Sequence, residues 1–162
     1  MFRLNWITTL SIVFWFSCSG AALATGLLDG RVFAGMIGPS ENPDLSDSLH
    51  FSDGHFWSDI CTRCGFRPGE YTAEQTEQGI VFRGVLESDT RGRFDYEGRV
   101  HDDGAIDVSI RWERKRWYWT SSREIAFRGV DGGKQEEPVT LQQIRLQMNS
   151  GELSSSPSCA RF

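Results

Sequence analysis

Residues 80–113 read IVFRGVLESDTRGRFDYEGRVHDDGAIDVSIRWE and decide the fold. Within this stretch, apolar and polar residues alternate in three runs, at 80–87, 93–100 and 106–113. Alternation with a period of two is typical of strands that have one buried and one solvated face. The gaps between the runs are rich in Asp and Gly, which favour tight reverse turns. The three runs therefore predict consecutive antiparallel strands.

The same pattern extends to both sides of this stretch. Tight turns make sequential strands antiparallel neighbours, and a flat meander would leave two long unpaired edges. We therefore predict an all-β protein, a small antiparallel up-and-down barrel of about eight strands, with a two-sheet β-sandwich as the alternative. The five weaker strand candidates lie at 30–36, 47–52, 55–60, 70–76 and 117–130.

Composition and charge fit one domain. The chain has 162 residues, of which 39 % are hydrophobic and 24 % charged, near the average for a single globular domain. Its 22 acidic and 17 basic residues give a net charge of −5, which argues against a dedicated nucleic-acid-binding protein. The sequence contains no phosphate-binding loop, and we predict no cofactor.

The first 24 residues predict a signal peptide. Residues 6–16 are apolar but shorter than the roughly 20 residues that a membrane span needs. Small residues then end in Ala22-Leu23-Ala24, a cleavage pattern ahead of Thr25. An uncleaved anchor and lipidation of Cys18 are the alternatives. We expect an exported protein, periplasmic or extracellular, with no transmembrane segment in the mature chain.

The mature chain divides into a barrel domain and a tail. Residues 25–28 lead into the barrel domain at 29–130, and a polar tail follows at 131–162. Apolar residues at helical spacing predict a short amphipathic helix at 139–148. Serines dominate 154–158, and we expect most of the tail to be disordered.

Three cysteines remain after the leader: Cys61, Cys64 and Cys159. An oxidising compartment predicts one structural disulfide that includes Cys61 or Cys64, formed between these two or with Cys159. Loop residues after Cys64 argue against a redox site. The two cysteines with His50 and His55 would suit zinc, but their spacing matches no standard zinc finger, so we predict no metal site.

Residues 111–119, RWERKRWYW, have the most unusual composition in the chain, with three Trp, one Tyr and four basic residues in nine positions. Such a hairpin could clamp an anionic or aromatic ligand, or bind an anionic envelope surface such as a membrane interface. The alternative is that its tryptophans fill the core while its basic residues only form a soluble turn. The candidate residues for an anionic surface are Arg114, Lys115 and Arg116.

Two glycines at inward-facing positions, Gly84 and Gly98, predict room inside the barrel for one small apolar or aromatic ligand. This predicts a secreted, non-catalytic binding protein, with surface interaction through hairpin 111–119 as one alternative. An enzyme of unknown chemistry is the other, with Arg123 as its polar group inside the bore. The predicted ligand-binding residues are Phe82, Phe94, Tyr96, Trp112, Trp117, Trp119 and Arg123.

The sequence offers no catalytic motif. It lacks the G-x-S-x-G elbow of many hydrolases, and no histidine has a visible nucleophile partner. Acidic residues such as Asp95 and Glu97 alternate with apolar ones, as expected for exposed strand faces rather than for a glycosidase carboxylate pair. We therefore assign no catalytic residue.

Several short motifs carry a family resemblance. They are LDGRVF at 28–33, FSDGHF at 51–56, Cys61 ahead of Gly65-Phe66 and Tyr71-Thr72, and KRWYWT at 115–120. Together they resemble a group of uncharacterised bacterial secreted proteins with a lipocalin-like look. The resemblance implies a calycin-type barrel but no activity. Lipocalins open with Gly-x-Trp where this chain has Gly30-Arg31-Val32, so ligand transport does not follow from it.

Overall fold

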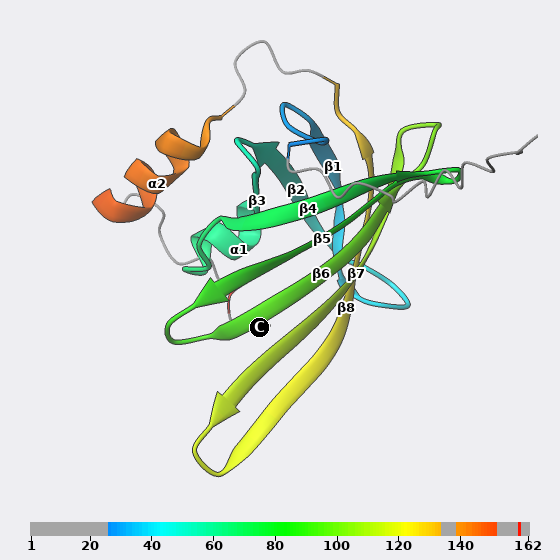
Figure 1. The fold of residues 1–162 in the computed structure, drawn as a ribbon. Coiled ribbons are helices and arrows are strands. Elements are labelled where there is room, and N and C mark those ends of the chain that lie inside the picture. Colours follow the sequence, from blue (N-terminus) through cyan, green and yellow to red (C-terminus); the bar gives the residue numbers. More distant parts are fainter. Residues whose placement is uncertain (1–25, 134–138, 152–158, 160–162) are drawn as a thin grey trace, which may run out of the picture.

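The computed structural model describes residues 26–133, 139–151 and 159. Eight strands form a closed barrel in which each strand pairs antiparallel with the next and β8 returns to β1 (Figure 1). The predicted up-and-down barrel is confirmed, and the alternative sandwich is wrong. The strands are β1 (Val32–Pro39), β2 (Leu45–Ser52), β3 (His55–Ser58), β4 (Gly69–Thr76), β5 (Gly79–Ser88), β6 (Gly92–Val100), β7 (Ala105–Arg116) and β8 (Trp119–Asp131).

The predicted signal peptide at 1–24, including Cys18, lies outside the described residues. So does 152–158, which contains the serine-rich part of the predicted tail. Neither helix of the described chain is long and apolar enough to cross a membrane.

The strand predicted at 55–60 is too long, because its last residues begin helix α1 (Asp59–Arg63). The Ser58 hydroxyl caps this helix by accepting a hydrogen bond from the Cys61 backbone N–H at 3.1 Å. The same hydroxyl donates to the buried carboxylate of Asp47 at 2.6 Å. These bonds hold α1 against the end of the barrel from which β7 and β8 project (Figure 1).

Strands β7 and β8 extend beyond the ends of the neighbouring strands β6 and β1. β6 follows β7 only as far as the pair Arg93 and Glu113, and β1 follows β8 only as far as Ile125. Within the described residues, 114–116 therefore pair only with 119–121, and no strand other than β7 pairs with 122–124. They form a two-stranded ribbon that projects beyond the barrel (Figure 1).

Aromatic rings fill the barrel interior, which corrects the expectation that Gly84 and Gly98 leave room for a ligand. A Cβ atom on Gly84 would lie 2.3 Å from the Phe56 ring, and one on Gly98 would lie 2.3 Å from the Phe82 ring. Both distances are far below van der Waals contact, so the glycines accommodate neighbouring rings. The other fully buried large aromatic residues of the barrel are Phe33, Phe51, Phe66, Tyr71, Phe94 and Phe127.

Part of the predicted tail packs against the barrel. Helix α2 (Leu141–Ser150) occupies the region of the helix predicted at 139–148 and is capped at its N-terminus by Thr140. Its apolar side, including Leu141 and Ile144, packs with Trp57 of β3. Beyond α2, a disulfide ties Cys159 to the barrel end, as described below.

Candidate functional site

The outer wall of β5 to β8 is a ladder of opposite charges. Glu97 accepts a hydrogen bond from Arg83 on the neighbouring strand at 2.7 Å. In the strand register, Arg111 stands between Asp95 and Glu124. Opposite charges on facing strands stabilise the sheet and help to fix its register. The charges of this wall are largely balanced, which sets it apart from the ribbon.

The ribbon ends in a two-residue turn made of Trp117 and Tyr118, because Arg116 pairs directly with Trp119. Neither turn residue has the positive φ that is usual in two-residue hairpin turns. The turn at Asp53-Gly54, in contrast, has positive φ at both positions. Backbone preference therefore does not explain the two large aromatic residues at the tip of the ribbon.

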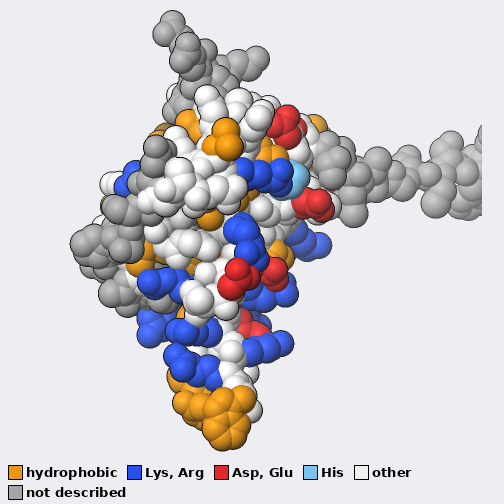
Figure 2. Space-filling model, turned by 90° about the vertical axis from the view of Figure 1, so that its left-hand side faces the viewer, with side chains coloured by type: hydrophobic (Ala, Val, Ile, Leu, Met, Phe, Trp, Pro, Cys, Tyr) orange, Lys and Arg blue, Asp and Glu red, His pale blue; other side chains and the backbone are white. Residues whose placement is uncertain are grey.

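Trp117, Tyr118 and Trp119, here called the aromatic tip, are exposed to solvent: their exposed fractions are 94 %, 61 % and 48 %. The Tyr118 ring lies 4.7 Å from that of Trp117 and 6.2 Å from that of Trp119, centroid to centroid. Figure 2 shows a hydrophobic cluster at the lower extreme of the molecule. The expectation that Trp117 and Trp119 line the bore or fill the core is wrong, because the barrel wall ends before it reaches them.

The other predicted ligand-binding residues fall into two groups. Phe82, Phe94, Tyr96 and Trp112 are buried in the core, so the structure brings these four together. Arg123 has the inward parity of β8 but lies beyond the wall, exposed, with its guanidinium 5.7 Å from the centroid of the Trp112 ring. The expectation of an inward-pointing Arg123 is therefore corrected. Ligand binding inside the barrel stays a prediction.

Basic side chains surround the base of the aromatic tip. Residues 111–124 contain five basic and two acidic side chains, a local charge of +3. Lys115 pairs with Glu113 at 3.3 Å. Among the described residues, the side chains of Arg114 and Arg116 have no ion-pair or hydrogen-bond partner. Figure 2 shows blue side chains directly above the orange cluster.

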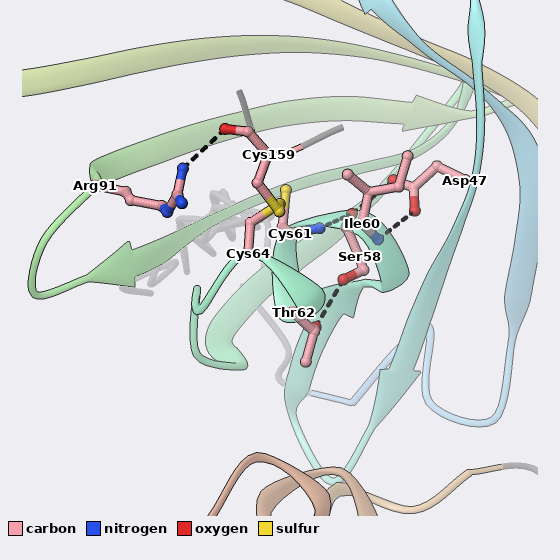
Figure 3. The surroundings of a disulfide bond; sticks show 8 residues. All are labelled: Asp47, Ser58, Ile60, Cys61, Thr62, Cys64, Arg91 and Cys159. Carbon is pink, nitrogen blue, oxygen red and sulfur yellow. Dashed lines mark hydrogen bonds between the residues drawn. A yellow bond between two sulfur atoms is a disulfide. The ribbon is translucent and has the colours of Figure 1, made fainter. Parts of the chain in front are cut away.

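The cysteines and histidines do not form one site. Cys64 and Cys159 form a disulfide, and Arg91 donates a hydrogen bond to the Cys159 carbonyl at 2.8 Å (Figure 3). Cys61 is a free thiol; burial raises its pKa to about 12, which makes it unreactive. His50 lies on the outer side of β2, stacked on Trp57. The described residues contain no group of three or more His, Cys, Asp or Glu side chains that could hold a metal.

Sequence reasoning missed two features of this end of the molecule. Tyr118 was not named as a site residue, although its place between two tryptophans in RWERKRWYW was the available signal. The buried carboxylate of Asp47 was also missed. Burial raises its pKa to about 6, although hydrogen bonds from Ser58 and the Ile60 backbone oppose the shift. Its parity with Leu49 and Phe51 on the strand predicted at 47–52 was the available signal.

Comparison of the chain with models of known protein families, with curated proteins and with solved structures gives no match.

Proposed function

We propose that this protein is an exported, non-catalytic binding protein that attaches to the surface of an anionic lipid bilayer through the β7–β8 ribbon. The observation that carries the proposal is the aromatic tip, exposed at the end of the ribbon with basic residues behind it. The disulfide between Cys64 and Cys159 supports export, because disulfides persist in oxidising compartments.

The order of side chains along the ribbon matches the order of layers at a bilayer surface. Trp and Tyr rings favour the level of the lipid headgroups, where one part of the ring is apolar and another can form hydrogen bonds. Lys and Arg side chains near an anionic surface each contribute about 1 kcal/mol. The aromatic tip is outermost and Arg114, Lys115 and Arg116 follow it. Both contributions therefore act in the same docked orientation.

The fold does not need the aromatic tip of the ribbon for its core, so the tip is available to bind a partner. The core is complete without it, since the three residues of the aromatic tip contribute nothing to the buried set. An exposed cluster of large aromatic rings is unfavourable in water and typical of surfaces that meet a partner. A bilayer is a suitable partner because the tip is narrow and convex, whereas protein partners usually need a wider face.

Vesicle co-sedimentation tests the proposal. Wild-type protein should sediment with phosphatidylglycerol vesicles at low salt and be released as salt rises, since exposed charges are screened over about 10 Å at 0.1 M. Arg114→Ser/Lys115→Ser/Arg116→Ser should weaken binding on the order of 100-fold, from about 1 kcal/mol for each basic residue. A control with the same charge change, Arg83→Ser/Arg99→Ser/Arg128→Ser on the barrel wall, should keep most of the binding.

Two results would contradict the proposal as a whole, and a third would contradict the choice of a lipid surface. One is that wild-type protein fails to sediment with anionic vesicles even at low salt. The other is that the ribbon variant and the barrel-wall variant lose binding equally, which would mean that binding depends only on the net charge of the protein. Binding to an anionic polysaccharide but to no vesicle would also count against a lipid surface.

A further inference from the structure

A groove of about 590 Å³ lies at the root of the ribbon. It runs between the turn that joins β5 to β6 and the edge of β7 that no strand covers. Its volume is in the range of small-molecule binding sites. The groove reaches the base of the aromatic tip, because Arg116 belongs to its lining and immediately precedes Trp117.

Five of the eight charged side chains that line the groove belong to ion pairs, and of the other three Glu87 stands opposite Arg93 in the strand register. Arg67 donates two hydrogen bonds to Asp89, at 2.8 and 2.9 Å. Arg93 is hydrogen-bonded to Asp95, and Lys115 pairs with Glu113, as noted above.

Arg114 and Arg116 also line the groove, and neither has a partner among the described residues. Both have the same parity on β7, so they lie on one face of the ribbon, about 7 Å apart along the strand. Two adjacent like charges on one face repel each other, and a ligand with two negative charges would relieve that repulsion. The hydroxyls of Ser88 and Thr90 add possible hydrogen bonds to such a ligand.

We infer that this groove binds a phosphomonoester group presented by a lipid in the bilayer. The planar fork of an arginine matches two phosphate oxygens, so two arginines can share one group. A phosphomonoester carries close to two negative charges at pH 7, whereas the phosphodiester of phosphatidylglycerol carries one. The inference rests on the proposed attachment to a bilayer and adds a preference for one headgroup chemistry.

The test compares vesicles of equal surface charge, one set with phosphatidate and the other with twice the mole fraction of phosphatidylglycerol. Wild-type protein should bind the phosphatidate vesicles about tenfold more tightly. Arg114→Lys/Arg116→Lys keeps the charge but removes both forks, and should abolish this preference while leaving binding to phosphatidylglycerol within about twofold. The matched control, Arg83→Lys/Arg99→Lys, lies outside the groove and should keep the preference.

Competition by a soluble phosphomonoester separates recognition of the phosphate group from general attraction to the charged surface. Glycerol 3-phosphate should displace wild-type protein from phosphatidate vesicles at concentrations at which equally charged sulfate does not.

Equal binding of wild-type protein to the two vesicle types would overturn this inference and leave the proposed bilayer attachment intact. Retention of the preference by the double lysine variant would also overturn it. Failure to bind either vesicle at low salt would overturn the bilayer attachment itself, and this inference with it.

Discussion

Strands β7 and β8 belong in part to the barrel and in part to the ribbon. Side chains alternate between two faces in both regions, but on β7 those at the inward parity are apolar in the barrel and basic in the ribbon. Inside the barrel, inward positions hold Val108, Ile110 and Phe127, all buried. Beyond the barrel, the same parity on β7 brings Arg114 and Arg116 to the surface. The strand pairing is continuous across the boundary, but the apolar inward face ends there. The barrel segment therefore carries the stability of the fold, which leaves the ribbon available for binding.

The largest contrast between the two regions should appear in stability. Phe82 is fully buried, so Phe82→Ala should lower the free energy of unfolding by about 3–5 kcal/mol. Trp117 is 94 % exposed, so Trp117→Ala should change it by no more than about 0.5 kcal/mol. Denaturant unfolding of both variants measures the difference. Similar losses in the two variants would mean that the ribbon belongs to the cooperative core.

The disulfide should have the next largest effect, again confined to the barrel. Cys64 and Cys159 are 95 residues apart, and a cross-link over so long a loop restricts the unfolded chain strongly. Cys64→Ser/Cys159→Ser should therefore lower the free energy of unfolding by about 2–4 kcal/mol. Vesicle binding by the folded variant should not change, because the ribbon lacks this bond. Lost binding at a temperature where the variant stays folded would contradict the separation of the two regions.

Asp47 should make the stability of the barrel depend on pH. Its pKa is about 6 when folded, against 3.8 for an ordinary Asp, so the folded state holds its proton more tightly. The stabilisation from this group is complete below pH 4 and is lost as pH rises through 6, an effect on the order of 2–3 kcal/mol.

The difference between wild-type protein and Asp47→Asn isolates this group from the exposed carboxylates. The free energy of unfolding of the wild type, relative to that of the variant, should rise as the pH falls from 7 to 4. A difference that stays constant over this range would mean that Asp47 does not titrate as expected.

The barrel could be predicted from the sequence because its signals are local. Alternation at 80–113 marks each strand, and Asp-Gly turns join neighbours without reference to the rest of the chain. The rim of the barrel is not a local property. It depends on where β6 ends near Arg93 and where β1 ends at Pro39, far in sequence from the ribbon. Parity placed Arg123, and the need for large residues in the core placed Trp117 and Trp119, inside a wall that does not extend to them.

Substitutions in the aromatic tip should change stability least, yet they should change how the protein meets the bilayer, because we propose that the tip enters the bilayer surface while the barrel stays outside. Tryptophan quenching by brominated lipids tests this directly, because bromine quenches only nearby indoles. The wild type should be quenched on binding, and Trp117→Phe/Trp119→Phe should bind with almost no quenching. The control Trp57→Phe removes an indole packed under α2 and should leave the quenching in place. Undiminished quenching in Trp117→Phe/Trp119→Phe, or none in bound wild type, would contradict insertion of the aromatic tip into the bilayer surface.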